Sequence, residues 1–404
     1  MLVPALFNFR QTPVNNIIRN NTGYAISADV QSLPEMTVNT LEGNSGNGYQ
    51  IRQGEMTSAS PKTFHWDDTD IVYVVDGYVT VGERVTLDIA PGMIIKFAPN
   101  RLIGVKGQLL ADGTADQPII FTSLKDDAAG GDTNGDRANS VPEPGDWGSI
   151  TFHDNNRHVD SVIQHAVVRY GGFHQDKGEG NGNDWYYAKP GHWDTVDYEG
   201  VIWLAGSSPT ISNSTIEENR QAIYLKDSSP RLLSNTVRNN TGYAISADVQ
   251  SLPEMSGNVL EDNSGNGYQV RPGEITSSSP KTFAWDDTDI VYVVDGYVTV
   301  GENITLDIAP GMVIKFAPNK LLGIKGRLLA EGVPDQPIIF TSLKDDAAGG
   351  DTNGDRANSV PEPGDWGSIT FHDNNRHVDS VIQHAVVRYG GFHQDKGEGN
   401  GNDW

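Results

Sequence analysis

The amino-acid sequence predicts an all-β fold of the β-solenoid type, in which short strands wind into coils that stack along one axis. Three observations lead to this prediction. The chain carries a near-identical tandem repeat of 219 residues, and a shorter period of 21–23 residues runs inside it. Each short period holds brief strands rich in β-branched residues, such as 222–225 and 268–270, between Gly, Asn and Ser-Pro turns, with no helical periodicity. A period of this length with several strands describes one coil of a solenoid.

The long repeat aligns residues 21–185 with residues 240–404 without a gap, and 19 of these 165 positions differ. Several differences exchange one aliphatic residue for another, as in Ile103→Leu322 and Val105→Ile324. Such exchanges are typical of core positions, where the side-chain volume has to be kept. An enzyme rarely gains from two almost identical sites in tandem. The duplication therefore favours a protein whose length or multiplicity matters.

Asparagine recurs at one point of the short period. Asn219 is followed by Asn240 after 21 residues and by Asn263 after 23 more, and Asn21 and Asn44 are likewise 23 residues apart. We expect these side chains to stack as a ladder whose amides bond to neighbouring coils.

The repeats suggest three segments along the chain. Residues 1–56 are predicted to be the C-terminal part of one β-helix unit, 57–275 a complete unit, and 276–404 the N-terminal part of the next. No linker separates them. Because both chain ends fall inside a unit, we expect that the chain either belongs to a longer repeat protein or joins copies of itself end to end.

The composition is acidic, with 53 Asp and Glu against 29 Lys and Arg and a formal net charge of −24. This balance argues against nucleic acid and anionic membranes as partners, because both attract positive charge. No apolar run approaches the roughly 20 residues of a membrane span. Cysteine is absent. The first nine residues do not resemble a signal peptide, so an export signal is expected to lie upstream or to be missing.

Several segments resemble the right-handed parallel β-helix of the pectin-lyase-like superfamily, in the form common in bacterial surface proteins. The segments that carry the resemblance are 85–97, 102–111, 118–123, 147–152 and 161–170. The resemblance implies a right-handed parallel β-helix over nearly the whole chain outside two insertions. It implies no single activity, because this scaffold carries lyases, hydrolases, adhesins and inert stalks.

The first insertion, residues 126–146, has the oxygen-ligand spacing of a calcium loop. The predicted Ca²⁺ ligands occupy loop positions 1, 3, 5, 9 and 12 in both copies: Asp132, Asn134, Asp136, Ser140 and Glu143, and Asp351, Asn353, Asp355, Ser359 and Glu362. The stretch resembles the calcium loops of EF-hand and dockerin proteins. It departs from them in Arg137, which replaces the usual Gly at position 6, and in two prolines that exclude a normal exiting helix. The alternative is a solvated Asp/Asn/Gly loop without metal.

The second insertion, residues 171–200, combines aromatic rings with carboxylates. Its candidate contact residues are Trp185, Tyr186, Tyr187, His192, Trp193 and Tyr198. Rings beside acids are how proteins hold sugars, since a ring stacks on a pyranose face while acids accept bonds from its hydroxyl groups. The alternative is that these rings pack on the β-helix or against a neighbouring copy of the chain.

These observations favour an extracellular or cell-surface structural or adhesive rod, a candidate filament subunit, stabilised by calcium. A carbohydrate-binding adhesin is the alternative, and it would differ only in what the second insertion contacts. A polysaccharide lyase or glycoside hydrolase is less favoured, because Asp126-Asp127 and Gly191-His192 match only fragments of the catalytic motifs of such enzymes. We therefore expect no catalysis.

Overall fold

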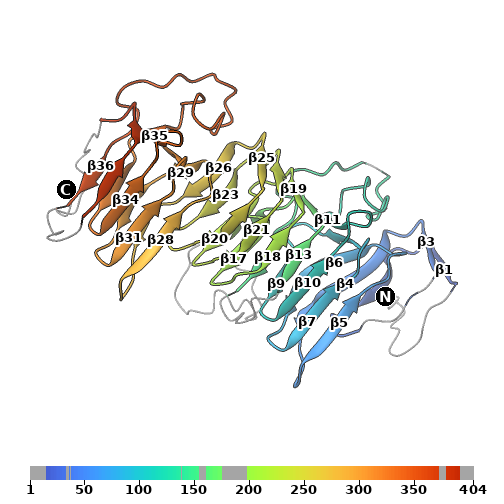
Figure 1. The fold of residues 1–404 in the computed structure, drawn as a ribbon. Coiled ribbons are helices and arrows are strands. Elements are labelled where there is room, and N and C mark those ends of the chain that lie inside the picture. Colours follow the sequence, from blue (N-terminus) through green and yellow to red (C-terminus); the bar gives the residue numbers. More distant parts are fainter. Residues whose placement is uncertain are drawn as a thin grey trace, which may run out of the picture. The chain divides into compact units, whose positions relative to one another are not determined.

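The computed structural model describes residues 15–32, 36, 38–137, 139–153, 161–174, 198–372 and 379–391. The chain forms two compact units, the first comprising residues 1–224 and 228–242 and the second residues 225–227 and 243–404. The regular elements of the described residues are short β-strands, without any helix (Figure 1). In this part of the chain, accordingly, there is no helix that is long and apolar enough to cross a membrane.

The first unit is built from strands of two to eleven residues. They are β1 (Ile17–Arg19), β2 (Tyr24–Ala28), β3 (Thr40–Glu42), β4 (Gly46–Met56), β5 (Lys62–Trp66), β6 (Tyr73–Val81), β7 (Val85–Ile89), β8 (Ile94–Phe97), β9 (Leu102–Val105), β10 (Gln108–Asp112), β11 (Ile119–Ser123), β12 (Ile150–Phe152), β13 (Val162–Gln164), β14 (Ala166–Arg169), β15 (Phe173–His174), β16 (Tyr198–Glu199), β17 (Ile202–Ala205), β18 (Thr210–Ser212), β19 (Thr215–Glu217), β20 (Ile223–Lys226), which begins here, β21 (Arg231–Leu233) and β22 (Thr236–Arg238).

Most of these strands stand in three columns of parallel neighbours. The first column contains β2, β4, β6, β8, β11, β14, β19 and β22. The second contains the C-terminal halves of β4 and β6, then β9, β12 and β17. The third contains β5, β7, β10, β13, β18 and β21. A separate parallel pair joins β1 and β3, and a short antiparallel pair joins β15 and β16.

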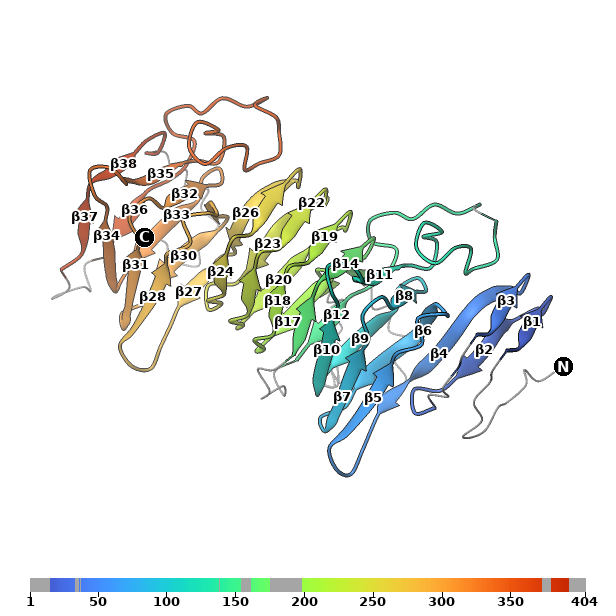
Figure 2. The same cartoon turned by 45° about the vertical axis from the view of Figure 1, so that its right-hand side comes forward.

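The second unit repeats this architecture. Its strands are β23 (Tyr243–Ala247), β24 (Glu254–Ser256), β25 (Val259–Glu261), β26 (Gly265–Val270), β27 (Gly273–Ile275), β28 (Lys281–Trp285), β29 (Tyr292–Val294), β30 (Tyr297–Val300), β31 (Ile304–Ile308), β32 (Val313–Phe316), β33 (Leu321–Ile324), β34 (Arg327–Glu331), β35 (Ile338–Ser342), β36 (Ile369–Phe371), β37 (Val381–Gln383) and β38 (Ala385–Val387). Its three parallel columns are β23–β26–β29–β32–β35–β38, β27–β30–β33–β36 and β28–β31–β34–β37 (Figure 2).

Parallel strands one coil apart are the hydrogen-bonding pattern of a β-solenoid, so the predicted fold class is confirmed. The apolar side chains stack in register inside the coils. Ile163 of β13 pairs with Ile211 of β18, which pairs with Leu232 of β21, and all three are fully buried. Burying such a side chain stabilises the fold by about 1.5–3 kcal/mol. Ile103 and Leu322, exchanged between the copies, are both fully buried, as the aliphatic exchange predicted.

The predicted asparagine ladder is present in the first unit. Asn219 is buried and lies in the turn between β19 and β20. Its Oδ1 accepts a hydrogen bond from Gly171 N at 2.8 Å, and its Nδ2 donates to Val168 O at 3.0 Å. The Oδ1 of Asn240 in the next coil accepts from Asn219 N at 2.9 Å. Each rung thus ties a turn to the coils on both sides, which satisfies backbone groups that a bend leaves without partners.

The two insertions leave the β-helix at the same turn of two successive coils. In the first unit, residues 124–146 lie between β11 and β12, and residues 171–200 lie between β14 and β17. The turn that carries asparagine rungs in other coils is therefore the turn that carries the chemistry-bearing insertions. The compact units begin and end at other residues than the predicted segments 1–56, 57–275 and 276–404. The segments follow the sequence repeat, and a repeat can be divided at any residue.

Candidate metal centre

The acidic loop, residues 124–146 and their counterparts 343–365, is shaped by two consecutive glycines. Gly130 and Gly131 have φ of 69° and 77°, in the left-handed region that only glycine adopts at little energetic cost. These two residues reverse the chain. The reversal brings Asp127 of the descending segment against Asp132 of the returning segment.

Three carboxylates gather at this reversal. Asp127, Asp132 and Asp136 each offer an oxygen, and these oxygens all lie within 4.8 Å of one another. The second copy repeats the arrangement with Asp346, Asp351 and Asp355. We call each group an acidic triad. Like charges at this distance repel one another, and a hard divalent cation bound by oxygen ligands would remove the repulsion.

The structure brings four of the five predicted calcium ligands together. Asp132 Oδ1 accepts from Asp136 N at 3.0 Å, and Asp132 Oδ2 accepts from Arg137 N at 3.0 Å. Asn134 Nδ2 donates to Asp136 Oδ2 at 3.0 Å and to Ser140 Oγ at 3.1 Å. Ser140 Oγ also donates to the Asp136 carboxylate. In the second copy, Asp351, Asn353, Asp355 and Ser359 make the same bonds.

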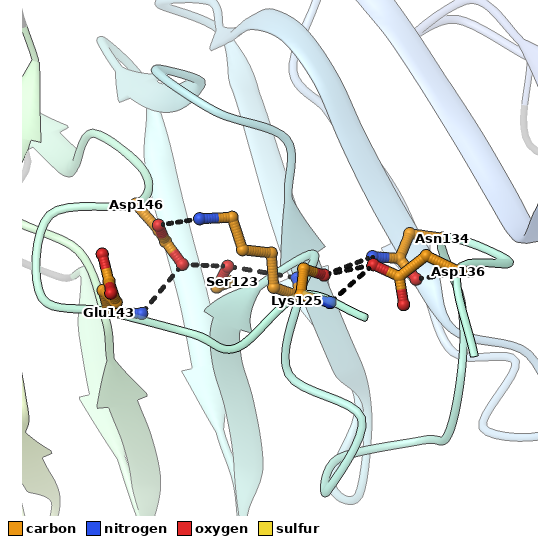
Figure 3. A network of polar contacts seen from close by, with 7 residues as sticks. Ser123, Lys125, Asn134, Asp136, Glu143 and Asp146 are labelled. Atoms are coloured by element: carbon orange, nitrogen blue, oxygen red, sulfur yellow. Dashed lines mark hydrogen bonds and ion pairs between the residues drawn. The ribbon is translucent and has the colours of Figure 1, made fainter. Parts of the chain in front are cut away.

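The fifth predicted ligand, Glu143, lies in a different group of residues. Its backbone N donates to Asp146 Oδ2 at 3.0 Å, and the same oxygen accepts from Ser123 Oγ at 2.8 Å. Lys125 Nζ is 2.6 Å from Asp146 Oδ1. Figure 3 shows Glu143 and Asp146 on one side and Asn134 and Asp136 on the other. Glu362 likewise donates its backbone N–H to Asp365, at 2.9 Å.

Asp127 is a site residue that the sequence reasoning did not assign to the metal. Its Oδ1 is buried and makes no hydrogen bond, and the same holds for Oδ1 of Asp346. Burial raises the pKa of the Asp127 carboxyl, and the neighbouring Asp132 raises it further. The only sequence signal was an extra Asp ahead of the Gly-Gly reversal. The spacing pattern begins at Asp132 and therefore passes over it.

A buried lysine lies beneath the acidic loop. Lys96 of β8 is fully buried, and its Nζ donates to Gly131 O at 2.7 Å. Burial lowers the pKa of Lys96 to about 8, while Asp126 and Asp127 act in the opposite direction. Lys315 repeats the contact with Gly350 O at 2.7 Å. A fixed positive charge next to the triad weakens, but does not cancel, the attraction of the triad for a cation.

Position 6 of the predicted calcium loop keeps the backbone conformation that glycine has in such loops. Arg137 has φ of 59°, and its counterpart Arg356 has φ of 58°. A non-glycine residue in this region is held there at a cost of about 1–2 kcal/mol. The replacement of the usual Gly by Arg137 therefore changes the residue type at position 6 and not the path of the chain.

Asp126, the other member of the acidic pair, is committed to the scaffold. It is 1% exposed, and its Oδ2 lies 2.6 Å from Arg169 Nη2 and accepts from Thr122 Oγ1 at 2.6 Å. Arg388, Asp345 and Thr341 repeat this group. The Asp126 carboxylate is thus neutralised by the guanidinium of Arg169, which belongs to the next coil of the first column.

The aromatic insertion lies almost entirely outside the described residues. Trp185, Tyr186, Tyr187, His192 and Trp193 fall there, as does Gly191. Tyr198 lies in β16, whose backbone pairs with β15. The structure describes the backbone of Tyr198 and not its side chain.

His153, at the end of β12, is a buried histidine in a polar and aromatic setting. It is 2% exposed, its Nε2 lies 2.9 Å from Thr151 Oγ1, and its ring centroid is 5.6 Å from that of Trp203. Burial lowers the pKa of His153 to about 3, and Lys106 adds to the effect. The side chain is therefore neutral in the folded protein at physiological pH.

The buried His153 predicts a loss of stability in mild acid. Below pH 6.5 the unfolded chain binds a proton at His153 that the folded chain accepts only near pH 3. The effect of His153 on the free energy of unfolding is close to zero above pH 6.5. Below pH 6.5, His153 lowers that free energy by about 1.4 kcal/mol per pH unit. We expect wild-type protein to lose about 2 kcal/mol more than His153→Gln between pH 7 and pH 5. Urea denaturation at both pH values measures the difference, and equal losses would contradict the prediction.

Comparison with known proteins agrees with the fold. A family model described as the right-handed beta helix region matches residues 150–280. Neither the curated proteins nor the solved structures give a match. The parallel columns and this family match make the fold a right-handed parallel β-helix, as the sequence predicted.

Proposed function

We propose that this right-handed parallel β-helix is an extracellular or cell-surface rod with a structural or adhesive role, stabilised by Ca²⁺. The acidic triad carries the proposal, because it recurs with the same residues and hydrogen bonds once in each 219-residue repeat. A repeated cation site in a repeated scaffold suits a protein that gains stability along its length. An adhesive role would fall to the second insertion, residues 171–200.

The residues of the loop fit a calcium ion chemically. Ca²⁺ takes six to eight oxygen ligands from carboxylates, amides, backbone carbonyls and water. Asp127, Asp132 and Asp136 would supply carboxylates, and Asn134 would supply an amide oxygen; Asp346, Asp351, Asp355 and Asn353 would do so in the second copy. Asp127 Oδ1 is buried without a hydrogen bond, so a cation would satisfy it. Glu143 and Glu362 would join only after a rearrangement of the loop.

The proposed extracellular location predicts a calcium site of modest affinity. Three carboxylates attract a divalent cation, while the buried Lys96 next to them weakens the attraction. Extracellular calcium modules typically bind with dissociation constants of about 10⁻⁴–10⁻³ M. We expect this site to fall in that range. A submicromolar constant from isothermal titration calorimetry would contradict the extracellular assignment.

Calcium is expected to raise the thermal stability of the full chain. Bound ligand at 100 times its dissociation constant stabilises the folded state by about 2.7 kcal/mol per site. We therefore expect an increase of several degrees in Tm when Ca²⁺ replaces EDTA, measured by differential scanning calorimetry. The double variant Asp132→Asn and Asp351→Asn should lose most of this increase. A matched control, Asp112→Asn, changes an exposed acid outside the loop and should keep it. An unchanged Tm in wild-type protein would exclude calcium stabilisation.

Self-association end to end is part of the same proposal. In the first copy, Phe152 and Val168 are fully buried, whereas their counterparts Phe371 and Val387 are 46% and 55% exposed. Within the first unit the next coil covers Phe152 and Val168 through β17 and β19. These two side chains lie in the last described coil, where a further coil of the repeat would cover them as β17 and β19 do in the first unit. We propose that copies of the chain associate end to end. Sedimentation velocity should show association that increases with concentration and is lost in Phe371→Asp. A monomer at every concentration would contradict it.

A further inference from the structure

The asparagine ladder is interrupted within the first unit. Rungs join β1 to β3, where Asn21 Nδ2 donates to Asn44 Oδ1 at 2.8 Å, and they resume at Gly171, whose N donates to Asn219 Oδ1 at 2.8 Å. Among the described residues, the turns after Val75 and Phe97 hold no such rung. The coils of β6, β8 and β11 therefore lack the device that ties neighbouring turns together elsewhere.

The ladder ends at Asn47. Asn44 donates to Asn47 Oδ1 through its backbone N at 3.0 Å and through Nδ2 at 3.1 Å. This oxygen takes the place that the next rung occupies within the ladder. The pair of β1 and β3 also stops here, since β3 pairs with β1 alone in the described chain. An unprotected strand edge would expose backbone groups.

The acidic loop covers this end of the ladder, although it lies 85 residues further along the chain. Asn47 N donates to Thr133 O at 2.8 Å, and Asn47 Nδ2 donates to Asp132 O at 3.2 Å. The fit is close. Thr133 is 1% exposed, and a Cβ on Gly48 would lie 3.0 Å from Thr133 Cγ2. A Cβ on Gly135 would lie 2.7 Å from Asn44 O.

The same loop contacts every coil of the interrupted region. A Cβ on Gly130 would lie 2.4 Å from Val72 Cγ2, just before β6. Lys96 of β8 donates to Gly131 O, and Thr122 of β11 donates to Asp126. Asp126 then pairs with Arg169 of β14, the strand that precedes the first rung of the next ladder section.

We propose that the acidic loop is a strap that fastens the coils between the end of one asparagine-ladder section and the beginning of the next, once in each repeat. In the second unit, Asn266 N donates to Thr352 O at 2.8 Å, Lys315 to Gly350 O, and Arg388 pairs with Asp345. The strap consists of hydrogen bonds and ion pairs within the chain and needs no metal. It therefore goes beyond the proposed function and stands if the calcium proposal fails.

The strap can be released selectively with Asn47→Asp. This change keeps Oδ1, which accepts from Asn44, and removes the Nδ2 donor to Asp132 O. Hydrogen–deuterium exchange of the full chain in EDTA reads the result. The amides of β4, β6 and β8 in the first copy should exchange roughly tenfold faster, the loss of about one buried hydrogen bond. Peptides that contain Ile51, or only one of Val85 and Ile94, are distinguishable by mass from those of the second copy.

Two further variants make the outcome decisive. Asn266→Asp should produce the same change in the second copy alone. Gly135→Val should release the first strap at the same end of the ladder, because its side chain would collide with Asn44 O. Faster exchange confined to residues 124–146 would show that the loop does not hold the coils together, and the proposal would fail. Equal acceleration in both copies after Asn47→Asp would contradict it as well, because a strap acts on its own coils.

Discussion

Trp147→Ala is expected to lower the free energy of unfolding of the first unit by about 3–5 kcal/mol, the usual effect of removing a fully buried large aromatic side chain. Trp147 is 0% exposed, and its ring lies parallel to that of Phe97 with centroids 4.0 Å apart. Its Nε1 donates to Arg169 O at 2.8 Å. The truncation therefore leaves a cavity, a ring without its partner and a carbonyl without its donor.

The size of this effect can be resolved with two related variants. Trp147→Phe keeps a ring at the position and loses the hydrogen bond, and we expect a smaller cost of about 1–3 kcal/mol. Trp366→Ala removes the equivalent ring, which lies 4.1 Å from Phe316, and should affect the second unit. Urea denaturation monitored by tryptophan fluorescence and hydrogen exchange measures both. A loss below 1 kcal/mol for Trp147→Ala would show that this packing contributes little.

The second large effect is expected for Arg169→Met. Asp126 has a 2% exposed side chain, and Arg169 Nη2 lies 2.6 Å from its Oδ2. Removing one partner of a buried ion pair typically costs about 3–5 kcal/mol, because the remaining charge is left in a medium of low dielectric constant. The acidic loop should also become more mobile, because the ion pair of Asp126 with Arg169 attaches it to β14. Urea denaturation is the measurement.

An exposed pair in the same unit is the matched control. Arg19 and Glu42 lie 3.5 Å apart with side chains 62% and 55% exposed. We expect Arg19→Met to change the stability by less than about 1 kcal/mol, as is usual for solvated ion pairs. The double variant Asp126→Asn with Arg169→Met should recover part of the loss. Equal effects of Arg19→Met and Arg169→Met would contradict the importance of burial.

The acidic loop shows where sequence reasoning reached its limit. The alternation of Asp132, Asn134 and Asp136 around a Gly turn is local, and the structure indeed bonds these residues to one another. Glu143 was inferred from its position in a loop that continues into a helix. Here the chain follows a different path, and Asp146 fixes Glu143 in a separate group. A spacing rule transfers only as far as the backbone path that it assumes.

The sequence by itself determined the repeat, the period of the coil, the inward aliphatic positions and the asparagine rungs. All of these follow from contacts between residues one coil apart, and a coil is encoded as a fixed step along the chain. The fold class could be predicted for the same reason.

Only the tertiary structure decided which residues from distant coils meet. The contacts of Lys96 with Gly131 and of Thr133 with Asn47 depend on where a long insertion folds back. An insertion has no period, so its path is set by shape and hydrogen bonding against the finished surface of the β-helix. The contact of Asn47 with Thr133 joins residues 86 positions apart, and no local pattern encodes it.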